Sequence, residues 1–426
     1  MEAREAAFKA IYHIIEEGKP SHIVLKGILS DLSGDRRDTA FVTRLVEGTV
    51  EMMIFLDHCI DFVSKVPVKK QKPVIRTALR LGVYQIMFMD SVPDSAAVNE
   101  TVKLVRKKGF SGLSGFCNGV LRNISRQKES ISKEVSKTPE VRYSCPSWLY
   151  EMLVNDYGSE TAEEILRGTL RDPDVSVRVN LSRITRDELL KRLQSRGINA
   201  FPGNLHDYSV LIADAGDISQ YPEFKEGLFQ VQDESSMFVA ELADIGPDDL
   251  VVDVCAAPGG KSLHACDMIK AANGKGRVIA RDISEQKTAL IQENIARSGF
   301  DCIETRVCDA CVPDAELFEK ADVVICDAPC SGLGIIARKP DVKYNMDPEK
   351  MKELQELQRK IIKASVTLLK PGGTFIYSTC TINKGENEEN VCWTEKETGL
   401  KHVLSKKLLP GIDGCDGFFI SKFVKE

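Results

Sequence analysis

The sequence of 426 residues has no long apolar run. The nearest candidate, the stretch around Gly82 to Met89, is far shorter than the roughly 18 residues that a membrane-spanning helix needs, so we expect no membrane role. The first residues do not resemble a signal peptide, and the 13 cysteines are an odd number spread from Cys59 to Cys415. These features favour a reducing, cytoplasmic compartment over secretion, and we expect no disulfide framework.

Two common phosphate-binding motifs are also missing from VVDVCAAPGGKS, residues 251–262. A Walker A loop requires a glycine five positions before Gly260, where Cys255 stands. The dinucleotide fingerprint requires three spaced glycines, whereas this segment has only the adjacent Gly259 and Gly260. The segment therefore favours neither a nucleoside triphosphatase nor a dinucleotide-dependent oxidoreductase.

Residues 1–128 predict an all-α domain, a bundle of helices joined by short connections. Near the N-terminus, apolar side chains recur at spacings of three and four until Gly18 and Pro20 end the run. Similar patterns follow in further segments, which are 39–63, 73–89, 94–106 and 113–124.

The charge of the chain is unevenly distributed. The net charge is −6, which by itself argues against a polyanionic partner. Residues 1–130, however, carry 20 Lys and Arg against 15 Asp and Glu, which leaves 37 against 48 for the remainder. A basic front end suits a nucleic-acid enzyme, although such asymmetry also arises by chance. Its two basic clusters are either a solvated helix face or an RNA-contacting surface. They consist of Lys69, Lys70, Lys72, Arg76 and Arg80, and of Lys103, Arg106, Lys107 and Lys108.

Residues 129–140 are polar and predict a linker. A small α+β module is expected over 141–230, where Val175, Val177 and Val179 alternate as in a half-buried strand.

The strand would place Arg178 and Asn180 on the face opposite its valines. We expect these two residues to be solvated or to contact RNA. A helix then opens at Thr185, with Glu188 as its capping-box partner.

Residues 231–426 predict an α/β domain with a mostly parallel, doubly wound, Rossmann-like sheet. Five β-rich runs alternate with helical stretches, namely VVDVCA, GRVIARD, CIETRVCD, ADVVICDA and TFIYSTC. Ligands bind at the carboxyl ends of the strands in such sheets. Four of the runs end on or next to an acidic residue or a cysteine, and these are Asp282, Asp309, Asp327 and Cys380.

The turn after the first of these strands lets the backbone approach a ligand closely at a helix N-terminus. A ligand with a carboxylate and a ribose, but without phosphates, fits such a loop. Asp282 stands about twenty residues later, where an acidic side chain takes both ribose hydroxyls. Asp309 could accept a hydrogen bond from an adenine amino group. Each aspartate alone is more often a helix cap or a turn residue, but together, at successive strand ends, they favour a nucleoside cofactor. The turn consists of Ala256, Ala257, Pro258, Gly259 and Gly260.

Two cysteines stand beside this expected ligand. Cys330 lies in DAPCSG after the fourth strand, and Cys380 lies at the tip of the fifth. Methyltransferases that act on exocyclic amines resemble the DAPCSG segment but have an aromatic residue in place of Cys330, so a thiol indicates different chemistry. Zinc is the competing interpretation for Cys308 and Cys311, but a lone C-x-x-C is weak evidence and we expect no metal. Other cysteines are expected to be buried small hydrophobes, namely Cys59, Cys117, Cys266, Cys302 and Cys326.

Several of these segments resemble the RNA 5-methylcytosine methyltransferases. The similarity lies in DVCAAPGGK, DAPCSG, ARKPDVKY, YSTC and the closing DGFF. Within these enzymes the chain resembles the bacterial RsmB/Sun/Fmu family, because RLGVYQIMF, AAVNETVKLVRK and FCNGVLRNI are similar to its N-terminal domain, which is like the antitermination factor NusB. The resemblance covers nearly the whole chain. One departure is Lys339, where many relatives have His.

The resemblance implies transfer of a methyl group from S-adenosylmethionine to carbon 5 of a cytosine in small-subunit ribosomal RNA. It implies that Cys380 attacks carbon 6 of the base and that Cys330 assists release. Asp327 would contact ring nitrogen 3, with Lys261 as a second polar contact. The target would lie in an accessible single-stranded or loop region, and we expect a monomer.

The resemblance also implies the residues that bind the cofactor. They are Cys255, Ala256, Ala257, Pro258, Gly259, Gly260, Lys261, Asp282, Asp309 and Asp327. Two other classes of protein remain: an RNA-binding assembly factor with an inactive methyltransferase body, and a nucleotide-cofactor oxidoreductase. The presence of both Cys330 and Cys380, together with Asp327 and Lys261, argues against the first class, and the missing glycine fingerprint argues against the second.

Overall fold

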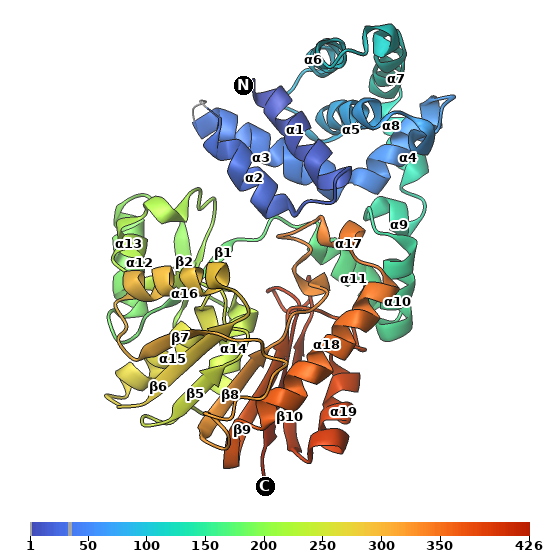
Figure 1. Ribbon diagram of the computed structural model, residues 1–426. Helices are drawn as coiled ribbons and strands as arrows, with labels where there is room; N and C mark the ends of the chain where they lie inside the picture. Colours follow the sequence, from blue (N-terminus) through green and yellow to red (C-terminus); the bar gives the residue numbers. More distant parts are fainter. Residues whose placement is uncertain (1, 33–35) are drawn as a thin grey trace. The chain divides into compact units, whose positions relative to one another are not determined.

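In the computed structural model, residues 2–32 and 36–426 are described. The chain forms two compact units. Figure 1 shows the chain coloured from its N-terminus to its C-terminus. The first combines Met1–Leu170 with Ile336–Asp347, and the second combines Arg171–Ile335 with Pro348–Glu426. Within the described part of the chain, no helix is both long enough and apolar enough to cross a bilayer.

The first unit is all-α, as the helical periodicity predicts. Helix α5 (Pro73–Phe88) lies at its centre, because most of its side chains are buried on every side and it packs against α1, α3, α4, α6 and α7. Gly48 on α3 permits the close approach of Tyr84, whose ring would collide with any added Cβ. The other helices are α1 (Ala3–Ile15), α2 (Ser21–Ser30), α3 (Arg36–Glu51), α4 (Met53–Val63), α6 (Asp94–Lys107), α7 (Ser114–Arg126), α8 (Lys128–Val135), α9 (Pro139–Arg142), α10 (Ser147–Tyr157), α11 (Ser159–Thr169) and α17 (Val342–Asn345), with 3-10 turns η1 (Val68–Lys70) and η2 (Ser111–Leu113).

The segment expected to be a linker, 129–140, is mostly helical. It contains the end of α8 and the start of α9, and Ile131 is fully buried in the core of the first unit. The polar composition of this segment thus does not make it an extended connection. A single buried aliphatic side chain, Ile131, anchors the short helix α8 to the core.

The two basic clusters are largely engaged in ion pairs within the first unit. Arg80 is only 6% exposed, and its guanidinium contacts Asp57 at 2.7 Å and Glu16 at 3.5 Å. Arg76 also pairs with Glu16. These two arginines form ion pairs between helices, so they do not belong to a solvated helix face. Lys69, Lys70 and Lys72 remain exposed, whereas Lys103, Lys107 and Lys108 each pair with a glutamate.

The segment Ile336–Asp347 packs on the helices of the first unit, although it follows strand β8 (Ala321–Asp327) of the second unit in the sequence. Asp341 accepts hydrogen bonds from the backbone N–H and hydroxyl of Ser21. Lys343 is 2% exposed and donates to the carbonyl oxygen of Glu51 at 2.8 Å. Burial lowers the pKa of Lys343 to about 8. The ARKPDVKY motif is therefore built into the helical unit.

The small module within 141–230 has a four-stranded antiparallel sheet of order β2-β3-β1-β4. The helix expected at Thr185 is present, and its capping box with Glu188 is complete. The elements are β1 (Val175–Val179), α12 (Arg186–Ser195), β2 (Ala200–Pro202), β3 (Ser209–Ile212), η3 (Ile218–Gln220), α13 (Pro222–Lys225) and β4 (Phe229–Val231).

Arg178 and Asn180 have no exposed surface, so the expectation that they are solvated or contact RNA is wrong. Arg178 donates to Gln232 at 2.9 Å and to Asp267 on α15 at 3.3 Å. Asp267 also accepts two backbone N–H groups from the turn after β1. The second face of β1 is thus covered by the neighbouring domain of the same unit, which the alternation of one strand cannot reveal.

The C-terminal part of the second unit contains a seven-stranded sheet of order β10-β11-β9-β8-β5-β6-β7. Its five predicted strands, β5 to β9, are parallel, which confirms the Rossmann-like expectation. The antiparallel pair β10 and β11 at one edge was not predicted. The strands are β5 (Leu250–Asp253), β6 (Arg277–Asp282), β7 (Ile303–Val307), β8 (Ala321–Asp327), β9 (Leu369–Thr379), β10 (Lys401–Leu408) and β11 (Phe418–Val424).

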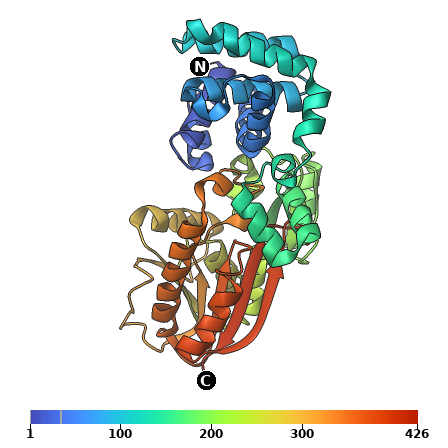
Figure 2. The same cartoon turned by 90° about the vertical axis from the view of Figure 1, so that its right-hand side faces the viewer.

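Helices cover both faces of this sheet. Apolar residues of α18 and α19 pack against alternate strand positions such as Val324 and Phe375, and the two helices lie side by side on that face (Figure 2). Residues of α14 and α15 pack against the intervening positions, such as Val323 and Ile376. The helices are α14 (Glu234–Leu242), α15 (Gly260–Ala271), α16 (Glu285–Ser298), α18 (Pro348–Val366) and α19 (Glu388–Thr398), with the turn η4 (Leu333–Ile335).

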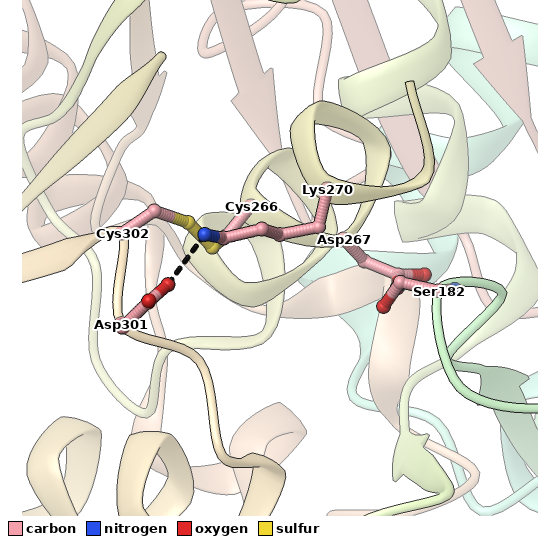
Figure 3. Close-up of a disulfide and its surroundings, with 6 residues drawn as sticks. All are labelled: Ser182, Cys266, Asp267, Lys270, Asp301 and Cys302. Atoms are coloured by element: carbon pink, nitrogen blue, oxygen red, sulfur yellow. Dashed lines mark hydrogen bonds and ion pairs between the residues drawn. A yellow bond between two sulfur atoms is a disulfide. The ribbon is translucent and has the colours of Figure 1, made fainter. Parts of the chain in front are cut away.

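Cys266 and Cys302, which we expected to be separate buried thiols, form a disulfide (Figure 3). It links α15 to the start of β7, with the two Cα atoms 6.2 Å apart and a sequence separation of 36. Lys270 and Asp301 form an ion pair of 2.5 Å next to it. The sequence could not reveal this pairing, because the two cysteines belong to elements that only the folded sheet brings together.

Candidate active site

The expected site residues gather at the carboxyl edge of the parallel strands. Asp282 ends β6, Asp327 ends β8, and Cys380 directly follows β9. The register pairs Asp327 with Ser378, two residues before that cysteine. A parallel sheet presents all these strand ends on one side, so residues far apart in the sequence share one site.

The glycine-containing turn leads from β5 into α15. Gly259 adopts φ +106°, a left-handed conformation that side-chain-bearing residues rarely reach, and it caps the helix. Its N–H donates to the carbonyl oxygen of Ala256 at 2.6 Å, which closes the turn over Ala257 and Pro258. An added Cβ on Gly260 would find no atom nearer than 3.9 Å, so this side of the turn is open. The first N–H groups of α15 have no partner within the helix and can receive an acceptor from a ligand.

Asp282 lies beside this turn and is 4% exposed. One carboxylate oxygen accepts from the N–H of Ala257 at 3.0 Å, and the other accepts from the N–H of Ile283 at 2.8 Å. Lys287 pairs with the second oxygen at 3.1 Å. Each carboxylate oxygen can accept more than one bond, so the group can also take the hydroxyls of a ribose.

Asp309 follows β7 and is exposed. Its side chain accepts from the N–H of Cys311 at 2.9 Å, and Cys308 accepts a hydrogen bond from Arg281. The lone C-x-x-C is thus part of a turn next to the strand end of Asp282. Across the described residues, no group of three or more His, Cys, Asp and Glu is placed to hold a metal ion.

Asp253 was missed by the sequence reasoning, although it ends β5 in the same way that Asp282 ends β6. It has no exposed surface and accepts from the hydroxyl of Ser262 at 2.7 Å. Its other oxygen, Oδ1, has no hydrogen-bond partner. Burial raises the pKa of Asp253 to about 7. A buried oxygen without a partner beside an open glycine turn fits the polar, positively charged end of an amino-acid ligand.

Lys261 and Asp327 form an ion pair at the centre of the site, with 2.6 Å between Nζ and Oδ2. The other oxygen of Asp327 accepts from the hydroxyl of Ser378 at 2.7 Å. Burial acts to lower the pKa of Lys261, but the attraction and hydrogen bond of Asp327 outweigh it and raise that pKa. Phe418, from the DGFF motif, places its ring centroid 5.3 Å from the same Nζ. The motif thus contributes a residue that the sequence reasoning did not single out.

The two cysteines of the motif pair are in direct contact, with 3.3 Å between their sulfur atoms. The hydrogen bond with Cys380, together with burial, raises the pKa of Cys330 well above its ordinary value. Cys380 also acts electrostatically on Lys261. The structure therefore brings together all four residues expected to be catalytic, which are Lys261, Asp327, Cys330 and Cys380.

Glycine makes the approach of the two cysteine segments possible. Gly334 donates its N–H to the carbonyl oxygen of Cys380 at 3.0 Å and accepts from the N–H of Gly417 at 2.8 Å. A Cβ on Gly334 would lie 2.0 Å from the carbonyl oxygen of Gly417. Three chain segments thus meet backbone to backbone at the site.

This sheet, glycine turn and set of strand-end acids define a Rossmann-like methyltransferase domain. The family described as 16S rRNA methyltransferase RsmB/F matches residues 240–424. The NusB family matches residues 1–126, and the RsmF/B-like ferredoxin-like domain matches residues 145–219.

Curated relatives match along nearly the whole chain. The probable ribosomal RNA small subunit methyltransferase B of Bacillus subtilis (strain 168) is 35% identical, over 99% of this chain and 98% of the relative. The ribosomal RNA small subunit methyltransferase B of Yersinia enterocolitica is 31% identical, with the same two coverages. The chain therefore belongs to the ribosomal RNA small subunit methyltransferase B family, and its cofactor is S-adenosylmethionine.

Solved structures support the fold. The crystal structure of PH0851 has a TM-score of 0.83 and 24% identity, covering 100% of this chain and 98% of that chain. The structure of NSun6 from Pyrococcus horikoshii with SFG has a TM-score of 0.59 and 23% identity, covering 66% of this chain and 98% of that one. At this level of identity, the likeness concerns the fold alone.

Proposed function

We propose that this enzyme methylates carbon 5 of a cytosine in small-subunit ribosomal RNA through a covalent bond between Cys380 and the base. The observation that carries the proposal is the contact of two thiols, 3.3 Å apart, next to the Lys261–Asp327 ion pair. A single buried cysteine would suggest packing, but a thiol pair beside an acid and a cation supports covalent chemistry.

The cofactor would lie over the carboxyl ends of β5 and β6. The turn from Cys255 to Gly260 and the first N–H groups of α15 would face its amino-acid end, Asp282 would accept from its ribose hydroxyls, and Asp309 would face its adenine. When bound, S-adenosylmethionine supplies an electrophilic methyl group on a sulfonium.

Cys380 supplies the activation that carbon 5 of cytosine lacks. Its thiolate adds to carbon 6, which makes carbon 5 an enamine-like nucleophile able to accept the methyl group. Lys261 is placed to stabilise this thiolate, because its ammonium interacts with both Cys380 and Asp327. Ring nitrogen 3 of cytosine carries no proton, so Asp327 would turn towards it in the protonated form, having taken the proton that Cys380 loses on becoming a thiolate, and would donate the hydrogen bond that stabilises the adduct. Asp327 would then give up its contact with Lys261 or with Ser378.

Cys330 is suited to the release step. Its hydrogen bond with Cys380 is the largest cause of its raised pKa, and this bond weakens once the Cys380 sulfur is bonded to carbon 6. Cys330 therefore becomes easier to deprotonate when a base is needed. It would then take the proton from carbon 5, the 5,6 double bond would re-form, and the carbon–sulfur electron pair would return to Cys380.

The base must leave its stack to reach these thiols, so the target would lie in single-stranded or loop RNA. The test is transfer of labelled methyl from S-adenosylmethionine to ribosomal RNA, followed by identification of the modified nucleoside. Methylation at another atom of the base, or at a sugar, would overturn the proposal.

Single substitutions distinguish the roles of Cys380 and Cys330. Cys380→Ala should abolish transfer while leaving cofactor binding unchanged. Cys330→Ala should transfer the methyl group once and then stall as an RNA–protein thioether, seen as a slow, protease-sensitive band on a denaturing gel. Cys392→Ala, which removes an exposed thiol on α19, is the matched control and should turn over normally. Retained turnover in Cys380→Ala would show that the roles of the two thiols are exchanged.

A further inference from the structure

Glu386 is a buried carboxylate that connects the segments of both active-site cysteines. It has no exposed surface and lies six residues after Cys380 in the turn before α19. It accepts hydrogen bonds from the backbone N–H of Ser331, at 3.0 Å, and from the Ser331 hydroxyl. Ser331 directly follows Cys330, so one carboxylate holds the neighbour of one active-site thiol.

The same carboxylate is tied to the Cys380 side of the site. Asn383 donates to Glu386 at 3.2 Å, and the hydroxyls of Thr381 and Ser331 lie 2.7 Å apart. Gln358 on α18 donates both to Glu386, at 2.8 Å, and to the carbonyl oxygen of Pro329, at 2.9 Å. Ser331 beside Cys330 and Asn383 beyond Cys380 therefore bond the same carboxylate, and Gln358 links that carboxylate to Pro329.

The backbone of Glu386 is held as firmly as its side chain. Its carbonyl oxygen accepts from the hydroxyl of Tyr377 at 2.6 Å and from Asn390 at 3.1 Å. Asn390 also donates to the side-chain oxygen of Gln358 at 2.8 Å, and the Tyr377 hydroxyl lies 3.2 Å from the same oxygen. The network is continuous, so a displacement of Glu386 would be passed to both loops.

The donors to the carboxylate oxygens are all neutral groups. Burying a carboxylate with only neutral donors is costly, and burial accordingly raises the pKa of Glu386. A glutamine is nearly the same size, and its burial would cost less free energy because it carries no charge. The presence of a carboxylate indicates that four acceptor sites on two oxygens, or the charge itself, are needed here.

We propose that Glu386 is a positioning residue that sets the spacing of the two active-site thiols by holding the Cys330 loop against the Cys380 strand end. This inference rests on the proposed covalent mechanism. The charge of Glu386 has a second effect, because it contributes to the raised pKa of Cys330 and so helps keep that thiol protonated before attack.

Three variants test this role. Glu386→Gln keeps the size but loses the charge and two acceptor sites, Glu386→Asp keeps the charge but shortens the side chain, and Glu389→Gln removes an exposed carboxylate nearby as the control. We expect Glu386→Gln and Glu386→Asp to lower kcat for methyl transfer about 10- to 100-fold with KM for S-adenosylmethionine unchanged. Glu389→Gln should match the wild type.

The pH dependence of thiol alkylation is followed at each cysteine by mass spectrometry, without RNA or cofactor. Loss of folding would lower the midpoint of every buried thiol, including that of Cys59, whereas loss of the Glu386 charge should lower the midpoint of Cys330 and leave that of Cys59 unchanged. In Glu386→Gln, the midpoint for Cys330 should move to lower pH. In Glu386→Asp it should stay near the wild-type value. If Glu386→Gln does not fold, Ser331→Ala removes one of the same bonds and should lower kcat in the same direction.

A wild-type kcat and an unchanged Cys330 midpoint in Glu386→Gln would overturn the inference. So would a loss of kcat that follows only a fall in thermal stability, with the remaining folded enzyme fully active. The proposed function fails separately, if the wild-type product is not 5-methylcytosine or if Cys380→Ala stays active.

Discussion

At the scale of the residue, the acids at the strand ends play different parts although the sequence shows them alike. Asp282 is buried but keeps unused acceptor capacity, Asp309 is exposed, and Asp253 is enclosed with one oxygen lacking a partner. Their burial, which depends on the neighbouring loops, decides which chemistry each can perform.

Replacement of Asp282 by Ala should weaken S-adenosylmethionine binding by roughly 1 to 3 kcal/mol, because the ribose hydroxyls lose their acceptor. Isothermal titration calorimetry measures the change. Glu285→Ala, three residues away and exposed, is the control and should bind normally. An unchanged affinity in Asp282→Ala would remove this residue from the cofactor site.

Asp253 should make stability depend on pH. Its pKa of about 7 in the folded state lies above the usual value near 3.9, so the folded protein holds an extra proton between these values. The free energy of unfolding should therefore fall as pH rises from about 4 to about 7. Asp253→Asn lacks this titration, so its stability relative to the wild type should increase from pH 5 to pH 8 in denaturant unfolding. A constant difference across this range would contradict the assignment.

Arg178 should be important for folding. Its removal leaves Asp267, 3% exposed, without its cation, and breaking a buried pair costs roughly 3 to 5 kcal/mol. Arg178→Ala should lower the unfolding midpoint strongly, as measured by circular dichroism. Arg192→Ala, which removes an exposed ion pair of the same module, should change it little.

At the scale of the element, the disulfide is a cross-link between α15 and the start of β7. It closes a loop of 36 positions, for which the chain-entropy estimate is about 4 kcal/mol. A dithiol reductant should therefore lower the thermal midpoint of the wild type but not that of the Cys266→Ser, Cys302→Ser double variant. Equal sensitivity of both proteins to the reductant would show that this bond contributes no stability.

At the scale of the whole molecule, the uneven charge distribution still suggests that the first unit binds RNA, but fewer basic residues are free to do so than the sequence indicated. Lys69 and Lys70 are exposed, while Arg76 and Arg80 are engaged with acidic partners. Lys69→Ala, Lys70→Ala should weaken binding of ribosomal RNA and make its salt dependence shallower, by about one unit of slope for each phosphate that the lysines no longer neutralise. Lys275→Ala, exposed in the second unit, should change neither quantity. An unchanged salt slope in the double variant would show that the helical front end does not hold RNA through these lysines.

The fold class and the positions of most candidate site residues could be predicted from the sequence. The periods of three to four and of two residues are local consequences of helix and strand geometry, so the helical unit and the parallel strands could be predicted from them. The strand ends bearing Asp282, Asp327 and Cys380 followed because parallel strands share one carboxyl edge.

Contacts between residues of distant segments could not be predicted in this way. Three features join segments that local spacing in the sequence does not relate. They are the burial of Arg178 against Asp267 of α15, the Cys266–Cys302 disulfide, and the packing of Ile336–Asp347 on the helical unit. The role of Glu386 also could not be predicted, because in the sequence it looks like any other glutamate that precedes a helix. Its role is visible only where two loops, 55 positions apart at Ser331 and Glu386, converge on one buried carboxylate.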